Sequence, residues 1–155
     1  MSMKTHEIWN RRFLSRIIDS MADGVFTMDS QGNISSWNQS MERISGYTAK
    51  EALGMRCDLL NCSGCFGEKC PGNIEKCRVF TQEHIEVKEC QLRHKDGHDV
   101  PVIKNASVVK DEDGVILGVV ETVTDVTELN QARQRAKQGA LRLGEIHRFD
   151  NIIGK

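Results

Sequence analysis

The stretch HIEVKECQLRHKDGHDVPVIKNASVVKDEDGVILGVVETVTDV, residues 84–126, decides the fold. Residues 84–94 alternate between apolar and polar side chains, which is typical of a half-buried strand. The turns KDGHD and DEDG each contain an Asp-Gly step, and they separate this segment from two further strands, at 100–110 and 115–126. The pattern therefore predicts an antiparallel meander of three strands.

A hairpin is expected earlier in the chain, in GVFTMDSQGNISSWN, residues 24–38. Two short strands, at 25–28 and 34–37, flank a turn in which Gly32 can supply a positive φ. Short helices should follow, one capped by Asn38 and one opened by the capping box of Thr48. The sequence thus predicts five strands, with short helices inserted after the second.

Helical segments flank this region. Residues 6–22 carry Trp9, Phe13 and Ile17 at i, i+4 and i+8, which predicts an amphipathic helix. Residues 127–147 read as a polar helix with a weak heptad seam. The seam is formed by Val126, Leu129, Arg133, Ala136, Ala140 and Leu143.

Composition narrows the class of function. A chain of 155 residues fits one domain with extensions, and its net charge of -1 shows no basic excess for nucleic acid. The N-terminus lacks the apolar core of a signal peptide, and no apolar run is long enough to span a bilayer, so we expect a cytoplasmic protein without membrane contact. The sequence shows no Gly-rich phosphate loop, no HExxH and no catalytic triad, so an enzyme is not expected.

Three stretches resemble the PAS sensor domain: DGVFTMDSQGNISSWNQSMERISGYTAKEALG, KDGHDVPV and DEDGVILGVVETVTDVTE. Their order and spacing carry the resemblance, together with the Asp125-Val126-Thr127-Glu128 junction. The resemblance implies an α+β fold of the PAS type. Such a fold is a five-stranded antiparallel sheet with short helices on one face, flanked here by N-terminal and C-terminal helices.

The expected domain organisation follows from that resemblance. It comprises an N-terminal helix (1–22), a PAS domain (23–128) with a Cys-rich loop (57–77), a signalling helix (129–147) and the start of a linker (148–155). PAS domains pair through flanking helices, which implies a homodimer formed through the two helical segments, and they pass their signal to an output domain of the same protein. The last residues, RFDNIIGK, resemble the opening of the AAA+ module of sigma-54-dependent enhancer-binding transcriptional regulators. A histidine kinase parent is the alternative.

Five of the six cysteines lie in CDLLNCSGCFGEKCPGNIEKC. In a reducing compartment, such a cluster indicates metal or redox chemistry more than a disulfide framework. The sixth should share the core-facing side of its strand with Leu92, and it could reach the others from there. The candidate cofactor-binding residues are Cys57, Cys62, Cys65, Cys70, Cys77 and Cys90.

Cysteine-only ligation suits an iron–sulfur cluster, which we favour, or zinc. Resemblance to the loop of several enhancer-binding regulators implies Cys57, Cys65 and Cys70 as ligands and leaves the fourth position open. We assign it to Cys77, with Cys62 or Cys90 as alternatives. The expected function is therefore redox or oxygen sensing through that group. The alternatives are thiol–disulfide sensing, a small-ligand or dimerisation module with structural zinc, or cysteines without a function.

Two other cofactors are disfavoured. Cys57 keeps the spacing of the flavin-adduct cysteine of blue-light PAS domains, but Arg56 replaces the asparagine that contacts flavin there. Haem would need an axial ligand, for which His84, His94 and His98 are candidates. The last two flank a turn that we expect to be solvated.

Overall fold

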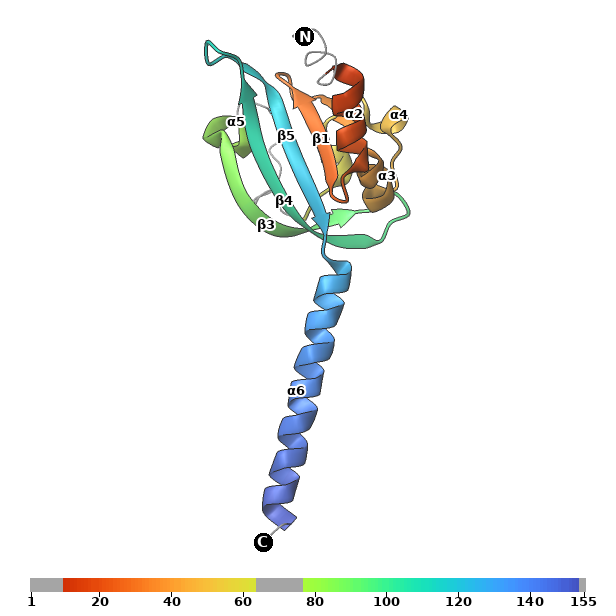
Figure 1. Ribbon diagram of the computed structural model, residues 1–155, viewed down its shortest axis with the longest axis vertical. Helices are drawn as coiled ribbons and strands as arrows, with labels where there is room; N and C mark the ends of the chain where they lie inside the picture. The colour runs from red at the N-terminus through yellow and green to blue at the C-terminus, as the bar shows by residue number, and fades with distance from the viewer. Residues whose placement is uncertain (1–9, 64–76, 154–155) are drawn as a thin grey trace, which may run out of the picture. The chain divides into compact units, whose positions relative to one another are not determined.

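The computed structural model describes residues 10–63 and 77–153 (Figure 1). The chain forms two compact units, Met1–Asp125 and Val126–Lys155. The first contains the sheet with its short helices, and the second is the C-terminal helix.

The first unit is built on a five-stranded antiparallel sheet with the strand order β2-β1-β5-β4-β3 (Figure 1). This confirms the predicted hairpin, because β1 pairs with β2, and the predicted meander, because β4 pairs with both β3 and β5. The strands are β1 (Gly24–Asp29), β2 (Ile34–Trp37), β3 (His84–Arg93), β4 (Asp99–Lys110) and β5 (Ile116–Asp125).

Apart from the N-terminal helix α2 (Arg11–Ser20), the described helices of this unit lie between β2 and β3 in the sequence, as predicted. They are α3 (Gln39–Ser45), α4 (Ala49–Ala52), the 3-10 helix η1 (Cys57–Leu60) and α5 (Arg78–Gln82). Their apolar side chains share one core with the inner face of the sheet, the face whose alternate residues are buried. This core includes Phe26, Trp37, Met41, Ala52, Leu60, Val79, Leu92, Val102 and Val123.

Asn38 joins three parts of the structure. Its Oδ1 accepts hydrogen bonds from the backbone of Val25 at 2.9 Å and of Met41 at 3.0 Å, so it caps α3 as predicted. Its Nδ2 donates to the carbonyls of Ile18 at 2.9 Å and Asp23 at 3.1 Å. A single buried amide therefore ties the N-terminal helix to β1 and α3.

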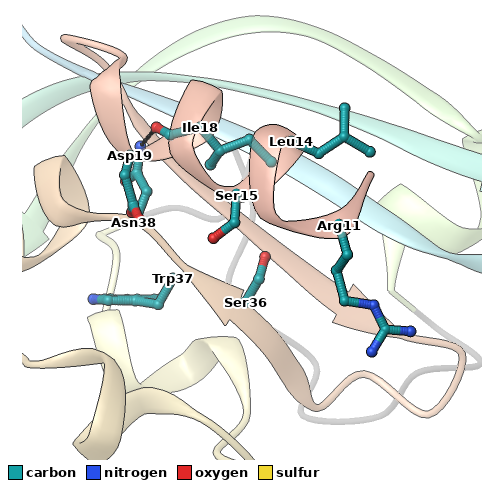
Figure 2. A pocket seen from close by; sticks show the side chains of 8 residues that line it. All are labelled: Arg11, Leu14, Ser15, Ile18, Asp19, Ser36, Trp37 and Asn38. Atoms are coloured by element: carbon teal, nitrogen blue, oxygen red, sulfur yellow. Dashed lines mark hydrogen bonds between the residues drawn. The ribbon is translucent and has the colours of Figure 1, made fainter. Parts of the chain in front are cut away.

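The N-terminal helix α2 spans Arg11–Ser20, inside the predicted range, whose first residues lie outside the described part. A groove of about 250 Å³ separates it from the end of β2 (Figure 2). Phe13 and Ile17 are 39% and 37% exposed, so part of the predicted apolar stripe is left uncovered in this chain.

One segment, residues 54–63, contacts both outer strands of the sheet, and we call it the bridging segment. At one end, Ile34 of β2 donates to the Met55 carbonyl at 2.7 Å and its own carbonyl accepts from Gly54 at 2.8 Å. At the other end, the backbone NH of Ser63 donates to the carbonyl of Gln91 in β3 at 2.9 Å. The segment thus runs from one edge of the sheet to the other.

The second unit is the helix α6, Thr127–Ile153. It continues past residue 147, where the sequence predicted its end, and includes much of the expected linker. The described residues of 148–155 contain no Pro and no break in pattern, so nothing local stops the helix there. No helix of the described ranges combines the length and apolarity that crossing a membrane requires.

Candidate functional site

Two charged side chains lie on the inner, buried face of the sheet. Lys104 occupies the β4 position between the buried Val102 and Ala106, and Glu121 pairs with Ala106 from β5. Their side chains are only 3% and 1% exposed, and Lys104 Nζ lies 3.1 Å from Glu121 Oε2. The centre of the sheet therefore contains an ion pair where alternation alone would place apolar residues.

This ion pair is not saturated by hydrogen bonds. Glu121 Oε2 lies at ion-pair distance from Lys104 but receives no well-directed hydrogen bond from the described residues. A buried carboxylate oxygen in that state costs free energy relative to a fully bonded one. The Glu121 carboxylate is therefore able to accept one more donor.

Cys62 and Cys90 meet beside this pair. Cys90, on β3, pairs with Val102 of β4 and is 8% exposed. It shares the inner face of the sheet with Leu92, as the sequence predicted. Cys62 is brought alongside by the bridging segment, whose Ser63 Oγ accepts a hydrogen bond from the backbone NH of Gln91 at 3.0 Å.

The two thiols are joined by a side-chain hydrogen bond, and Lys104 Nζ donates to Cys62 Sγ at 3.8 Å. We call Cys62, Cys90, Lys104 and Glu121 the inner-face cluster. It contains two thiols, one cation and one anion in a largely dry environment. The thiols come from segments far apart in the sequence, so the cluster exists only in the folded chain.

The surroundings of Cys62 control its ionisation. The hydrogen bond with Cys90 and burial both raise the pKa of the Cys62 thiol, while the nearby Lys104 charge opposes them more weakly. The net effect is a strongly raised pKa. At neutral pH the thiol is protonated, so it must lose a proton before it can bind a metal or react with an oxidant.

The other predicted cysteine ligands are packed elsewhere against the core or lie outside the described residues. Cys57 begins η1 and Cys77 precedes α5, and both are half-buried against the core. Cys65 and Cys70 fall in the part of the loop that the structure does not describe. Within residues 10–63 and 77–153, no three cysteines bring their sulfur atoms to one point. The predicted four-cysteine site therefore depends on Cys65 and Cys70 and stays a prediction.

A second cluster of chemically active side chains lies on the turn between β3 and β4. His94, Asp96 and His98 place their ligand atoms within 4.8 Å of one another. The turn is bound to α3, since Lys95 donates its backbone NH to the Ser45 carbonyl at 2.9 Å. Two of the three haem candidates are therefore in this turn, and the side chain of the third, His84, is outside the described set.

Lys104 and Glu121 were not predicted as site residues from the sequence, although their positions in the strand pattern indicated them. In VPVIKNASVV and VVETV, strict alternation assigns both to the same face as Val102 and Val123. A charged residue at a core-facing position of a central strand is uncommon and marks a candidate site.

Comparison with known proteins agrees with this architecture. The family model described as "PAS domain" matches residues 22–128. The chain is 25% identical over 144 residues to the signal transduction histidine-protein kinase AtoS of Escherichia coli (strain K12). The match covers 88% of this chain but 23% of the kinase, so the chain spans about a quarter of that relative.

Solved PAS domains share the fold. One from Colwellia psychrerythraea superposes with a TM-score of 0.59 and 24% identity, covering 76% of this chain and 97% of that one. The PAS domain of an HTR-like protein from Haloarcula marismortui gives 0.57 and 21%, covering 80% and 97%. The family match, the strand order and the inserted helices agree, and the chain belongs to the PAS domain family.

Proposed function

We propose that this chain is the sensory module of a signalling protein and that its input is redox state, read by cysteine thiols at the inner-face cluster. The observation that carries the proposal is the contact between Cys62 and Cys90 beside the buried Lys104–Glu121 pair. Two thiols held in contact in the core are positioned to react with each other, whereas isolated buried thiols are inert.

Oxidation of this pair is a thiol–disulfide exchange. Cys62 first loses its proton to water, and its thiolate attacks one sulfur of a small disulfide such as oxidised glutathione. The S–S bond of glutathione breaks, a mixed disulfide forms on Cys62, and one glutathione leaves as a thiolate that takes up a proton. Cys90 then loses its proton to water, and its thiolate attacks the Cys62 sulfur of the mixed disulfide; the second glutathione leaves as a thiolate and takes up a proton. The products are a Cys62–Cys90 disulfide and two glutathione thiols, so the oxidant gains the two electrons that the chain loses.

The iron–sulfur or zinc site remains part of the proposal as the other chemistry that these thiols can support. Cys57, Cys65, Cys70 and Cys77 would hold it, with Cys62 or Cys90 as a substitute ligand. The structure describes four of these six cysteines: Cys57, Cys62, Cys77 and Cys90. The first three are half-buried, Cys90 is buried, and all four pack in or against one core. Bound there, such a group would supply a one-electron or oxygen-labile centre, or a structural staple.

The buried Lys104–Glu121 ion pair connects the cysteines to the strand that precedes the C-terminal helix. Glu121 lies on β5, and the chain leaves β5 at Asp125 to begin α6 at Thr127. A new covalent bond or metal next to Lys104 changes the field at Glu121, so it changes the strand that leads into the helix. Two output domains are candidates for the whole protein. The similarity to a histidine kinase supports a kinase, and the resemblance of RFDNIIGK to an AAA+ module supports a transcription activator.

Metal and thiol analysis of oxygen-free protein tests the proposal. Iron with sulfide, or stoichiometric zinc, that disappears in Cys65→Ser and Cys70→Ser variants supports a ligated group. A metal-free chain that forms a Cys62–Cys90 disulfide with oxidised glutathione supports the exchange. Peptide mapping identifies the linked cysteines, and Cys77→Ser serves as the matched control for this disulfide, because Cys77 is outside the Cys62–Cys90 pair. A metal-free chain in which no pair of cysteines responds to the oxidant contradicts redox sensing.

A second candidate function is recognition of a small molecule by the ion pair. Glu121 Oε2 can accept another hydrogen bond, as described above. A ligand with an amine or amide donor fits this oxygen, because a buried acceptor gains most from a new donor. Thermal shift with a panel of amines and amino acids, compared between the chain and Glu121→Gln, would reveal such a ligand.

A further inference from the structure

The turn between β3 and β4 places two imidazoles and a carboxylate together on an otherwise ordinary hairpin. His94 Nδ1 lies 3.2 Å from Asp96 Oδ1, and His98 Nδ1 contacts the same oxygen. The two imidazole rings are stacked, with centroids 4.5 Å apart and an interplanar angle of 23°. Both imidazole Nδ1 atoms therefore lie beside the same carboxylate oxygen, and the three ligand atoms are within 4.8 Å of one another.

The 3.2 Å between His94 Nδ1 and Asp96 Oδ1 is compatible with two ligand atoms around one metal ion. A transition metal binds imidazole nitrogen and carboxylate oxygen at about 2.0–2.2 Å, which places neighbouring ligand atoms about 3 Å apart. His94 Nδ1 accepts a hydrogen bond from the Asp96 backbone NH at 3.1 Å, so this nitrogen is unprotonated; a metal bound to it would replace that hydrogen bond. Two imidazoles and one carboxylate suit Zn²⁺, Ni²⁺, Co²⁺ or Fe²⁺.

The rest of the structure holds part of this turn in place. The His94 ring packs against Gly46, where an added Cβ would lie 2.4 Å from His94 Cε1, so its orientation is fixed by the end of α3. Lys95 pairs with Glu51 of α4, and its backbone NH donates to the Ser45 carbonyl. One ligand is thus preorganised, while His98 is 57% exposed and free to adjust to an ion.

We propose that His94, Asp96 and His98 form a surface site for a divalent first-row transition metal, independent of the cysteines. Three protein ligands leave the remaining positions to water, so the site is open on its solvent side. An ion bound there would fasten the β3–β4 turn, which joins the strand of Cys90 to the strand of Lys104. The site adds a metal input to the module and does not rest on the proposed redox function.

Titration of the whole chain with Ni²⁺ or Co²⁺ under reducing, oxygen-free conditions tests this site. In two-dimensional NMR spectra, the paramagnetic ion should first broaden the resonances of residues 93–99 and 45–47. The Co²⁺ absorption spectrum should lack thiolate charge-transfer bands at the first equivalent, because nitrogen and oxygen ligands do not give them.

Three variants make the test specific. His98→Ala changes an exposed side chain, so the fold should persist while the affinity falls roughly tenfold or more. His94→Ala should behave alike if it folds. Asp113→Ala, in the histidine-free turn between β4 and β5, is the matched control and should leave the affinity unchanged. Unchanged affinity in His98→Ala, or broadening that begins at the cysteines, would overturn the proposal.

Discussion

Lys104 Nζ lies 3.1 Å from Glu121 Oε2 at the centre of the sheet, and neither side chain is more than 3% exposed. Removal of one partner would leave a buried, unpaired charge, which costs more than the pair contributes. We therefore expect Lys104→Met to lower the free energy of unfolding by about 3–5 kcal/mol.

The double variant Lys104→Met/Glu121→Leu should recover most of that loss, because apolar side chains of similar volume fill the same space. Urea unfolding of the unchanged chain, Lys104→Met, Glu121→Leu and the double variant measures both effects. A double variant as unstable as the single one would show that the pair is needed for folding itself.

The thiol contact makes a prediction about reactivity. The hydrogen bond with Cys90 is the largest cause of the raised pKa of Cys62, so Cys90→Ala should lower that pKa and increase the thiolate fraction. Iodoacetamide should then modify Cys62 severalfold faster near neutral pH, as followed by mass spectrometry of peptides. Cys77→Ala is the control, and an equal acceleration there would argue against a specific contact.

The same pKa shift makes stability depend on pH. The folded chain keeps the Cys62 proton above the ordinary thiol pKa of 9.0, whereas the unfolded chain releases it. The folded state then binds more protons, so stability should fall as the pH rises above about 9. Urea unfolding at about pH 8 and about pH 10 should show a smaller loss for Cys62→Ser than for the unchanged chain. Equal losses would mean that other groups cause the alkaline slope.

Asn38 offers a test of the junction between helices and sheet. Asn38→Ala removes the cap of α3 and leaves buried backbone groups without partners, so we expect a loss of about 2–4 kcal/mol. Asn10→Ala removes the comparable cap of α2 at an exposed site and should cost about 1 kcal/mol or less. Chemical unfolding compares the two, and similar small losses would contradict the role assigned to Asn38.

The sheet could be predicted because its signals are local. Alternation and the Asp-Gly turns specify strands and connections within a few residues, and the caps at Asn38 and Thr48 mark helix starts. The site could be predicted only in part. Cys90 was placed correctly on the inner face by its period of two.

The contact of Cys90 with Cys62 depends on two hydrogen bonds between Ser63 and Gln91, one between backbone groups and one accepted by Ser63 Oγ, which the spacing of residues does not specify. The helix α6 was predicted to end at residue 147 because residues 148–155 were assigned to a linker by resemblance, although no proline or other stop signal lies between residue 147 and Ile153. The His94–Asp96–His98 arrangement was read as solvated turn chemistry, since spacing alone does not show that His94 is held against Gly46.

The bridging segment also shields the two edges of the sheet from pairing with strands of other protein molecules. An outer strand normally exposes backbone groups that can recruit a strand from another molecule, and such recruitment leads to aggregation. Here the segment forms hydrogen bonds with Ile34 on one edge and Gln91 on the other. Any event that pulls it away, such as oxidation or crosslinking within the Cys-rich loop, would uncover both edges together and favour self-association by strand addition.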